Sequence, residues 1–123
     1  MNDIKTDKIN GIRQRIKKFV LQVILYAKQI PKDEVGRVFV HQLLRAVTSI
    51  GANFEEASEA QSNRDLIYKL YVVKKEAKES HYWIDLTCEA FPDLSFQGAT
   101  LKKENIEIIR IISSIINKKK IEH

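Results

Sequence analysis

The sequence predicts an all-α protein that folds as a single antiparallel up-and-down four-helix bundle. Apolar residues recur at alternating spacings of three and four in four long segments, which is the period of a helix face packed on a core. Only four Gly and two Pro interrupt the 123 residues, too few for many short strands. The links between the first three segments are very short, and helices joined by short links pack antiparallel. A chain of this length suits one domain and buries about two thirds of the surface that its unfolded form exposes.

The first helix is expected from about Lys8 to Ile30, and residues 1–7 are expected to form a flexible N-terminus. Pro31 ends the helix, because the residue before a proline is disfavoured in the α conformation. Its apolar seam alternates spacings of three and four, and it consists of Ile9, Ile12, Ile16, Phe19, Val23, Tyr26 and Ile30.

The second helix is expected to begin near Asp33, a candidate N-cap. Gly51 lies in the middle of the segment, where glycine costs about 1 kcal/mol relative to alanine. Either a neighbouring helix approaches closely there or the helix kinks, and the small neighbours Ser49 and Ala52 favour a close approach. The apolar seam of this helix consists of Val40, Leu43, Val47, Ile50, Phe54 and Ala57.

The third helix is expected to begin at Ser62, with Asp65 three residues later in a pattern like a capping box, and to end before Pro92. Its seam consists of Leu66, Leu70, Val73, Ala77, Ser80, Ile84, Thr87 and Phe91.

The fourth helix is expected from about Leu101 to Asn117, after a longer link over residues 92–100. The bundle domain therefore spans residues 8–117, and residues 118–123 form a basic flexible tail. Isoleucines lie on several sides of this helix, so one side is expected to contact another subunit. They are Ile106, Ile108, Ile109, Ile111, Ile112, Ile115 and Ile116.

Several classes of protein are disfavoured by what the sequence lacks. Cys88 is the only cysteine, and the chain has neither an apolar signal segment nor an 18-residue apolar run, so we expect a cytoplasmic protein. A glycine-rich phosphate loop, paired cysteines for zinc and a G-x-S-x-G motif are all absent. We expect no enzyme and no cofactor. Cys88 is interpreted as a small buried hydrophobe rather than a catalytic thiol, although folding could bring His41 or His81 near it.

A di-metal site is the best enzymatic alternative, because helical bundles hold such metals with glutamates and Glu-x-x-His motifs. Glu56 and Glu59 lie on the second helix, and Glu76, Glu79 and His81 on the third, but no Glu-x-x-His occurs. Glu79 and His81 are two residues apart, so they face different sides of a helix. The favoured interpretation is structural: Asn53, Glu56, Glu76 and Glu79 flank the seams and hydrogen-bond across the second and third helices.

The formal net charge is +5 and it is unevenly distributed. Residues 1–32 carry eight Lys and Arg against two Asp, and residues 92–123 carry six against four acids. Such basic segments could contact nucleic acid or another acidic partner, although charge alone favours their interpretation as solvated helix faces. The candidate nucleic-acid-binding residues are Arg13, Arg15, Lys17, Lys18, Arg64, Lys74, Lys75 and Lys78.

Aromatic residues are interleaved with the lysines of the third helix, and they could stack on the bases of a single strand. The alternative, which we slightly favour for these rings, is packing in the core or an interface. They are Tyr68, Tyr71, Tyr82 and Trp83.

Three stretches carry a resemblance to a known family: Pro31-Lys32-Asp33-Glu34 with residues 42–57 (QLLRAVTSIGANFEEA), residues 65–70, and residues 75–84. Together they resemble the signature of the small four-helix bundle proteins called 23S ribosomal RNA intervening-sequence proteins, over about residues 8 to 117. Arg45, Ser49 and Asn53 belong to this signature as structural residues. One departure is Ala57, where many relatives carry glycine.

The resemblance implies a bundle assembled into a homopentameric ring. It also implies kinship with the accessory variability proteins of diversity-generating retroelements, which are basic pentameric barrels that bind nucleic acid and a reverse transcriptase. It supplies no catalytic residues. The expected partners are therefore copies of this chain, RNA or DNA, and a reverse transcriptase or other protein by analogy, with no membrane.

The expected function is a non-enzymatic oligomeric bundle that binds RNA or DNA through basic helix faces. The alternative is a protein-protein interaction scaffold without a nucleic-acid role, and a bundle metalloenzyme comes third.

Overall fold

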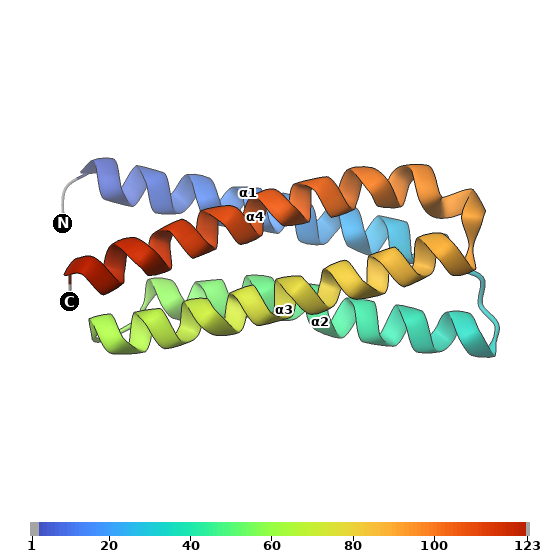
Figure 1. Ribbon diagram of the computed structural model, residues 1–123, viewed down its shortest axis with the longest axis horizontal. Helices are drawn as coiled ribbons and strands as arrows, with labels where there is room; N and C mark the ends of the chain where they lie inside the picture. The colour runs from blue at the N-terminus through green and yellow to red at the C-terminus, as the bar shows by residue number, and fades with distance from the viewer. Residues whose placement is uncertain (1–2, 123) are drawn as a thin grey trace.

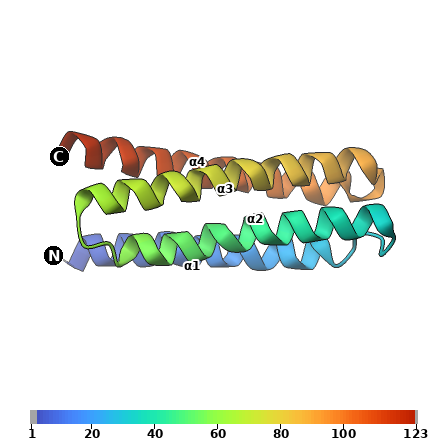
Figure 2. The same ribbon diagram turned by 90° about the horizontal axis from the view of Figure 1, so that it is seen from below.

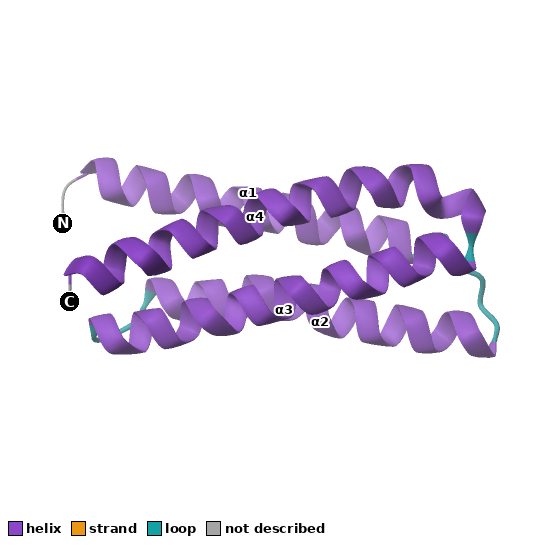
Figure 3. Cartoon of the chain, viewed as in Figure 1, coloured by secondary structure: helices purple, strands orange, loops and turns teal. Residues whose placement is uncertain are grey.

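A computed structural model of the protein describes the backbone of residues 3–122 and the side chains of residues 8–122. Four long helices make up nearly all of it, and this part of the chain contains no strand (Figure 3). The elements in order are α1 (Asp3–Ala27), α2 (Glu34–Ser58), α3 (Asn63–Ala90), the short 3-10 helix η1 (Pro92–Leu94) and α4 (Ser95–Glu122). The predicted all-α fold is confirmed.

The helices alternate in direction along one long axis. The N-terminus, the C-terminus and the α2–α3 link lie at one end of the bundle, and the α1–α2 and α3–α4 links lie at the other (Figure 1). Each helix contacts the next in sequence, and α4 returns to contact α1 (Figure 2). α1 and α3 therefore lie on one diagonal, and α2 and α4 on the other. This is the predicted up-and-down bundle, in which α1 packs less extensively than the other helices.

The predicted starts of the second and third helices are confirmed, because each has its capping side chain in place. The backbone N–H of Gly36 donates to Asp33 Oδ1 over 2.8 Å, and the N–H of Asp65 donates to Ser62 Oγ over 3.1 Å. Each bond satisfies one of the N–H groups that have no partner within the first turn of a helix. α3 ends at Ala90, just before Pro92, as the proline predicts.

Four helix boundaries differ from the predictions, at both ends of α1 and at both ends of α4. α1 begins at Asp3 and ends at Ala27, whereas residues 8–30 were expected, and Ile30 is buried although it lies beyond the helix. α4 begins at Ser95, six residues before the expected Leu101, because residues 92–94 form η1 and lead directly into it. α4 also continues to Glu122.

Helix thus extends into both segments that were expected to be tails, over residues 3–7 and 118–122. Residues 1, 2 and 123 lie outside the described part of the chain. Whether the tails are flexible stays a prediction.

The apolar seams meet in one core, with Phe19, Leu43, Val73 and Ile112 fully buried. The fourth helix buries Ile112 together with Ile108 and Ile116, whereas Ile106 is exposed. None of the described helices is long and apolar enough to cross a membrane.

The close approach expected at Gly51 is not there, and α2 runs through this residue without a break. A Cβ atom at Gly51 would lie 3.8 Å from Val20 Cγ2, an ordinary van der Waals distance. The close approach lies at Gly98 of α4, where a Cβ would overlap Cys88 Sγ and lie 2.7 Å from Tyr26 Oη. The prediction was wrong because the sequence placed Gly98 in the link over residues 92–100, whereas it lies in the first turns of α4.

Cys88 and Tyr26 form a small buried polar contact under η1. Tyr26 Oη donates to the carbonyl of Leu94 over 3.0 Å and lies 3.6 Å from Cys88 Sγ. Burial, followed by the contact with Cys88, raises the pKa of the Tyr26 phenol. The hydrogen-bonding neighbours of the thiol are Tyr26 and backbone carbonyls, rather than His41 or His81.

Candidate nucleic-acid interface

The basic residues selected from the sequence fall on two opposite sides of the bundle. Arg13, Arg15, Lys17 and Lys18 belong to α1, whereas Arg64, Lys74, Lys75 and Lys78 belong to α3. Since α1 and α3 lie on a diagonal, one chain does not bring the two groups together (Figure 1).

The two arginines of α1 are engaged in ion pairs with neighbouring helices. Arg13 Nε and Nη2 donate to the two carboxylate oxygens of Glu55 on α2 over 2.7 and 2.6 Å. Arg15 donates in the same way to Glu104 on α4 over 2.7 and 2.8 Å. These hydrogen bonds lower the pKa of Glu55 and of Glu104 and raise that of each arginine.

Such forked pairs fix α1 against its neighbours and neutralise the guanidinium charge. Lys17 and Lys18 remain exposed, without a hydrogen bond or ion pair to the described part of the chain. The α1 group is therefore a weaker anion site than its sequence predicts.

The third helix, by contrast, carries a continuous row of exposed cationic and aromatic side chains, which we call the α3 stripe. Spacings of four and three repeat along it, so it follows one face of the helix, opposite the seam that enters the core. The tyrosines are 63, 42 and 57% exposed in chain order, so core packing does not explain them. The stripe consists of Arg64, Tyr68, Tyr71, Lys75, Lys78 and Tyr82.

The cations of the α3 stripe are not neutralised by ion pairs with other described residues. Arg64, Lys75 and Lys78 make no hydrogen bond or ion pair with residues 8–122. The tail of α4 adds a further cation, because Lys120 Nζ lies 5.1 Å from the centre of the Tyr71 ring. Lys74, half-buried, lies between the stripe and the core.

Trp83 differs from the tyrosines, because it is half-buried and packs against other rings. Its ring centre lies 5.8 Å from that of Phe39 on α2 and 5.3 Å from that of Tyr82. Ring packing, and not stacking on the bases of a nucleic acid, therefore accounts for Trp83.

The acidic residues next to the stripe are directed toward α2. Arg45 of α2 lies 2.5 Å from Glu79 and 3.5 Å from Glu76, whose side chain is nearly buried. The hydrogen bond from Arg45, together with its charge, holds the pKa of Glu79 below its usual value. Lys69 pairs with Glu56 over 2.9 Å. These pairs connect α2 and α3.

Carboxylates follow the stripe at its C-terminal end, because the same spacing continues from Tyr82 to Asp85 and Glu89. Asp85 pairs with Lys102 of α4 over 2.8 Å, and Glu89 is exposed.

Two other signature residues bond within α2 rather than across helices. Ser49 Oγ donates to the carbonyl of Arg45 over 2.7 Å, and Asn53 Nδ2 donates to the carbonyl of Ser49 over 2.8 Å. The glutamates considered for a metal site are thus used in ion pairs or lie apart. Within the described residues, no group of three His, Cys, Asp or Glu side chains is close enough to hold a metal.

Asn105 of α4 is a fully buried polar residue that was not predicted from the sequence. Its Nδ2 donates to the carbonyl of Ala77 on α3 over 2.7 Å, and its Oδ1 has no partner among the described residues. The available signal was a polar residue in phase with Ile108 and Ile112 on the buried face.

Comparison with known proteins agrees with this architecture. The family described as 23S rRNA-intervening sequence protein matches residues 9–114. A crystal structure of a protein of unknown function from the S23 ribosomal protein family of Bacteroides thetaiotaomicron is 33% identical, with a TM-score of 0.82, over 89% of this chain and 98% of that one. No curated protein sequence matches the chain. On the extent of the family match, the chain belongs to the 23S rRNA-intervening sequence protein family.

Proposed function

We propose that this protein is a non-enzymatic, self-associating helical bundle that binds single-stranded RNA or DNA through the α3 stripe. The observation that carries the proposal is the row of exposed tyrosines and cations over residues 64–82, whose cations are not paired with a carboxylate of residues 8–122. Aromatic rings offer stacking surfaces to bases, and free cations offer contacts to phosphates. The family description, which refers to a ribosomal RNA gene, is consistent with an RNA partner.

The dimensions and charge of the stripe set the expected strength of binding. From Arg64 to Tyr82 it extends about 27 Å at about 1.5 Å per helical residue. Four cations along it, Lys120 included, predict that the logarithm of the binding constant falls with the logarithm of salt concentration with a slope of about −3. Each base stacked on a tyrosine adds about 1–3 kcal/mol that salt does not screen.

Self-association would repeat this weak site in one assembly and raise its avidity. Exposed apolar side chains on the opposite side of the bundle support it. Leu25 of α1 and Phe96 of α4 line one shallow groove, and Phe96 is 87% exposed. The proposal includes assembly as a homopentamer and a cytoplasmic location.

A second candidate function, a protein-interaction scaffold, is favoured by the same exposed apolar residues. Kinship with the accessory variability proteins suggests a reverse transcriptase as one partner. Recovery of one stoichiometric protein after nuclease treatment, with no RNA or DNA binding by the pure protein, would favour the scaffold.

The test is fluorescence anisotropy of labelled single-stranded RNA, duplex RNA and duplex DNA at two salt concentrations. Two double variants remove the cations or the rings of the stripe: Lys75→Gln with Lys78→Gln, and Tyr68→Ala with Tyr82→Ala. The matched control, Lys17→Gln with Lys18→Gln, removes the same charge from α1.

We expect binding that prefers single strands, weakens with salt, and is weaker in the stripe variants but not in the control. The first variant should also lower the salt slope by about 1.4, since about 0.7 is expected for each phosphate contact. Binding that is absent at low salt, or that the control abolishes as strongly as the stripe variants, would refute the proposal.

A further inference from the structure

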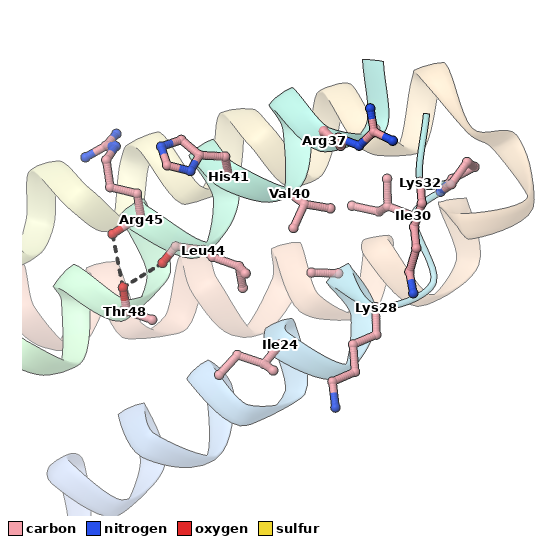
Figure 4. Close-up of a pocket in the computed structure, with 13 residues that line it drawn as sticks. Ile24, Lys28, Ile30, Lys32, Arg37, Val40, His41, Leu44, Arg45 and Thr48 are labelled. Atoms are coloured by element: carbon pink, nitrogen blue, oxygen red, sulfur yellow. Dashed lines mark hydrogen bonds between the residues drawn. The ribbon is translucent and has the colours of Figure 1, made fainter. Parts of the chain in front are cut away.

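A groove of about 580 Å³ lies between α1 and α2, beside the link that joins them. Figure 4 shows Ile24 of α1 on one side and Val40 and Leu44 of α2 on the other. With Ala27 and Ile30 these side chains form an aliphatic floor, and three of them are half-exposed. The groove is therefore a solvent-open apolar surface, of the size that ligand pockets usually have.

Basic side chains surround this floor. Lys28, Lys32, Arg37, His41 and Arg45 line the groove, and no aspartate or glutamate does. The first four make no hydrogen bond or ion pair within the described part of the chain, whereas Arg45 is held by Glu79. Figure 4 shows Lys28, the first residue of the link after α1, across the groove from Arg37 and His41 of α2.

Asp33 and Glu34 are the nearest acids in sequence, and neither lines the groove. The Asp33 carboxylate accepts the N–H of Gly36, which holds it on the first turn of α2. A Cβ atom on Gly36 would overlap the carbonyl of Pro31, so the link lies tightly against α2 and keeps this end of the groove in shape. The folded link thus places Lys28 and Lys32 on the same groove as Arg37 of α2.

We propose that this groove docks an amphipathic helix of a partner protein that carries aspartate or glutamate beside its apolar face. Helices bind such grooves with aliphatic anchors at spacings of three and four. The floor offers aliphatic contacts of that kind, and Lys28, Lys32 and Arg37 are placed to pair with flanking carboxylates. The floor contains no aromatic ring on which a base could stack, which favours a peptide over a nucleic acid.

This inference is independent of the proposed role of the α3 stripe. The groove is lined by residues of α1, α2 and their link, and no residue of the α3 stripe lines it. Occupation of the groove would also strengthen the packing of α1, which is the least extensive in the bundle.

The probe is a phage-displayed library of helical peptides of about 16 residues, a length at which isolated helices begin to be stable. After selection on the full-length protein, enriched peptides are synthesised with a fluorescent label, and their affinity is measured by anisotropy. The rim variant is Lys28→Glu with Arg37→Glu, and the floor variant is Leu44→Gln. The matched control is Lys75→Glu with Lys78→Glu on α3. Circular dichroism and unfolding midpoints verify that each variant is folded. The rim variant changes only exposed residues, so the test remains valid even if Leu44→Gln unfolds.

We expect enriched peptides to combine aliphatic residues at spacings of three and four with flanking acids. Their affinity should fall by about tenfold or more in the rim variant, because two attractive charge pairs become repulsive, and by about twofold or less in the control. Failure to enrich any peptide, enrichment without acids, or equal affinity for the rim variant would overturn the proposal. Displacement of the peptides by unlabelled single-stranded RNA from both the wild type and the control would also overturn it and assign the groove to nucleic acid, because the control lacks the stripe cations Lys75 and Lys78.

Discussion

Replacing Gly98 with alanine should destabilise the bundle, although the same change usually stabilises a helix. Alanine is favoured over glycine by about 1 kcal/mol in a helix interior. At Gly98, however, the added methyl would overlap Cys88 Sγ and crowd Tyr26 Oη. Both neighbours are buried, so neither can turn out into solvent.

The magnitude follows from three contributions. Overpacking of a well-filled core costs about 1–3 kcal/mol. Displacing Tyr26 from the carbonyl of Leu94, now 3.0 Å away, loses a hydrogen bond that contributes about 0.5–1.5 kcal/mol. After the helix gain is subtracted, we expect Gly98→Ala to lower the free energy of unfolding by about 2 kcal/mol, or the melting temperature by about 5–10 °C.

Urea and thermal unfolding followed by circular dichroism measure this change, and Gly51→Ala is the matched control. At Gly51 the new methyl makes an ordinary contact with Val20, so this variant should gain about 0.5–1 kcal/mol. A double-mutant cycle with Cys88→Ala identifies the clash, since removing the sulfur should restore about 1 kcal/mol or more to Gly98→Ala. If Gly98→Ala is as stable as wild type, or if the cycle shows no coupling, the packing argument is wrong.

Three further predictions concern buried polar groups and surface ion pairs. Asn105→Leu should leave the free energy of unfolding within about 1 kcal/mol of wild type or raise it, because an acceptor without a partner is replaced by an apolar group of similar size. A loss above about 2 kcal/mol in urea unfolding would contradict this expectation. The melting temperature should be constant above about pH 6 and fall between about pH 5 and 3, because carboxyls with a lowered pKa in the folded state stabilise it only while they are ionised. The carboxyls with a lowered pKa are Glu55, Glu79, Asp85 and Glu104. Glu104→Gln should make the fall of the melting temperature with pH shallower. A melting temperature that does not change with pH would exclude the ion pairs as contributors to stability. The thiol of Cys88, only 8% exposed, should react with a thiol reagent at a rate that follows unfolding in urea, and rapid reaction of the native protein would contradict its placement.

Much of the fold could be predicted from sequence, because its determinants are local. Helical periodicity identified which residues of each helix face the core, and the caps at Asp33 and Ser62 identified where two helices begin. The errors lie where the end of a helix depends on distant contacts. α4 begins early, after η1 places Leu94 in the core with its carbonyl bonded to Tyr26.

The candidate site was less predictable, because charge along a chain does not reveal how charges pair in space. Arg13 and Arg15 resembled the best nucleic-acid contacts in sequence, yet folding pairs them with Glu55 and Glu104, residues 42 and 89 positions away. Packing in the core or an interface was slightly favoured for the tyrosines of α3, and the structure excludes the core for them, because they lie on the surface of the chain. Spacing alone identified the face that they share but not whether a neighbour covers it.

The sequence by itself determined the helical class, the four segments, the inward faces and the family, because each depends on residue spacing or on a contiguous motif. Tertiary structure alone decided that Gly98 and not Gly51 marks the close approach, that the arginines of α1 are paired, and that cations of the first link and α2 surround an aliphatic groove. Each of these properties depends on which side chains of separate helices meet. That meeting is governed by the relative placement of the helices, which the period of one helix does not encode.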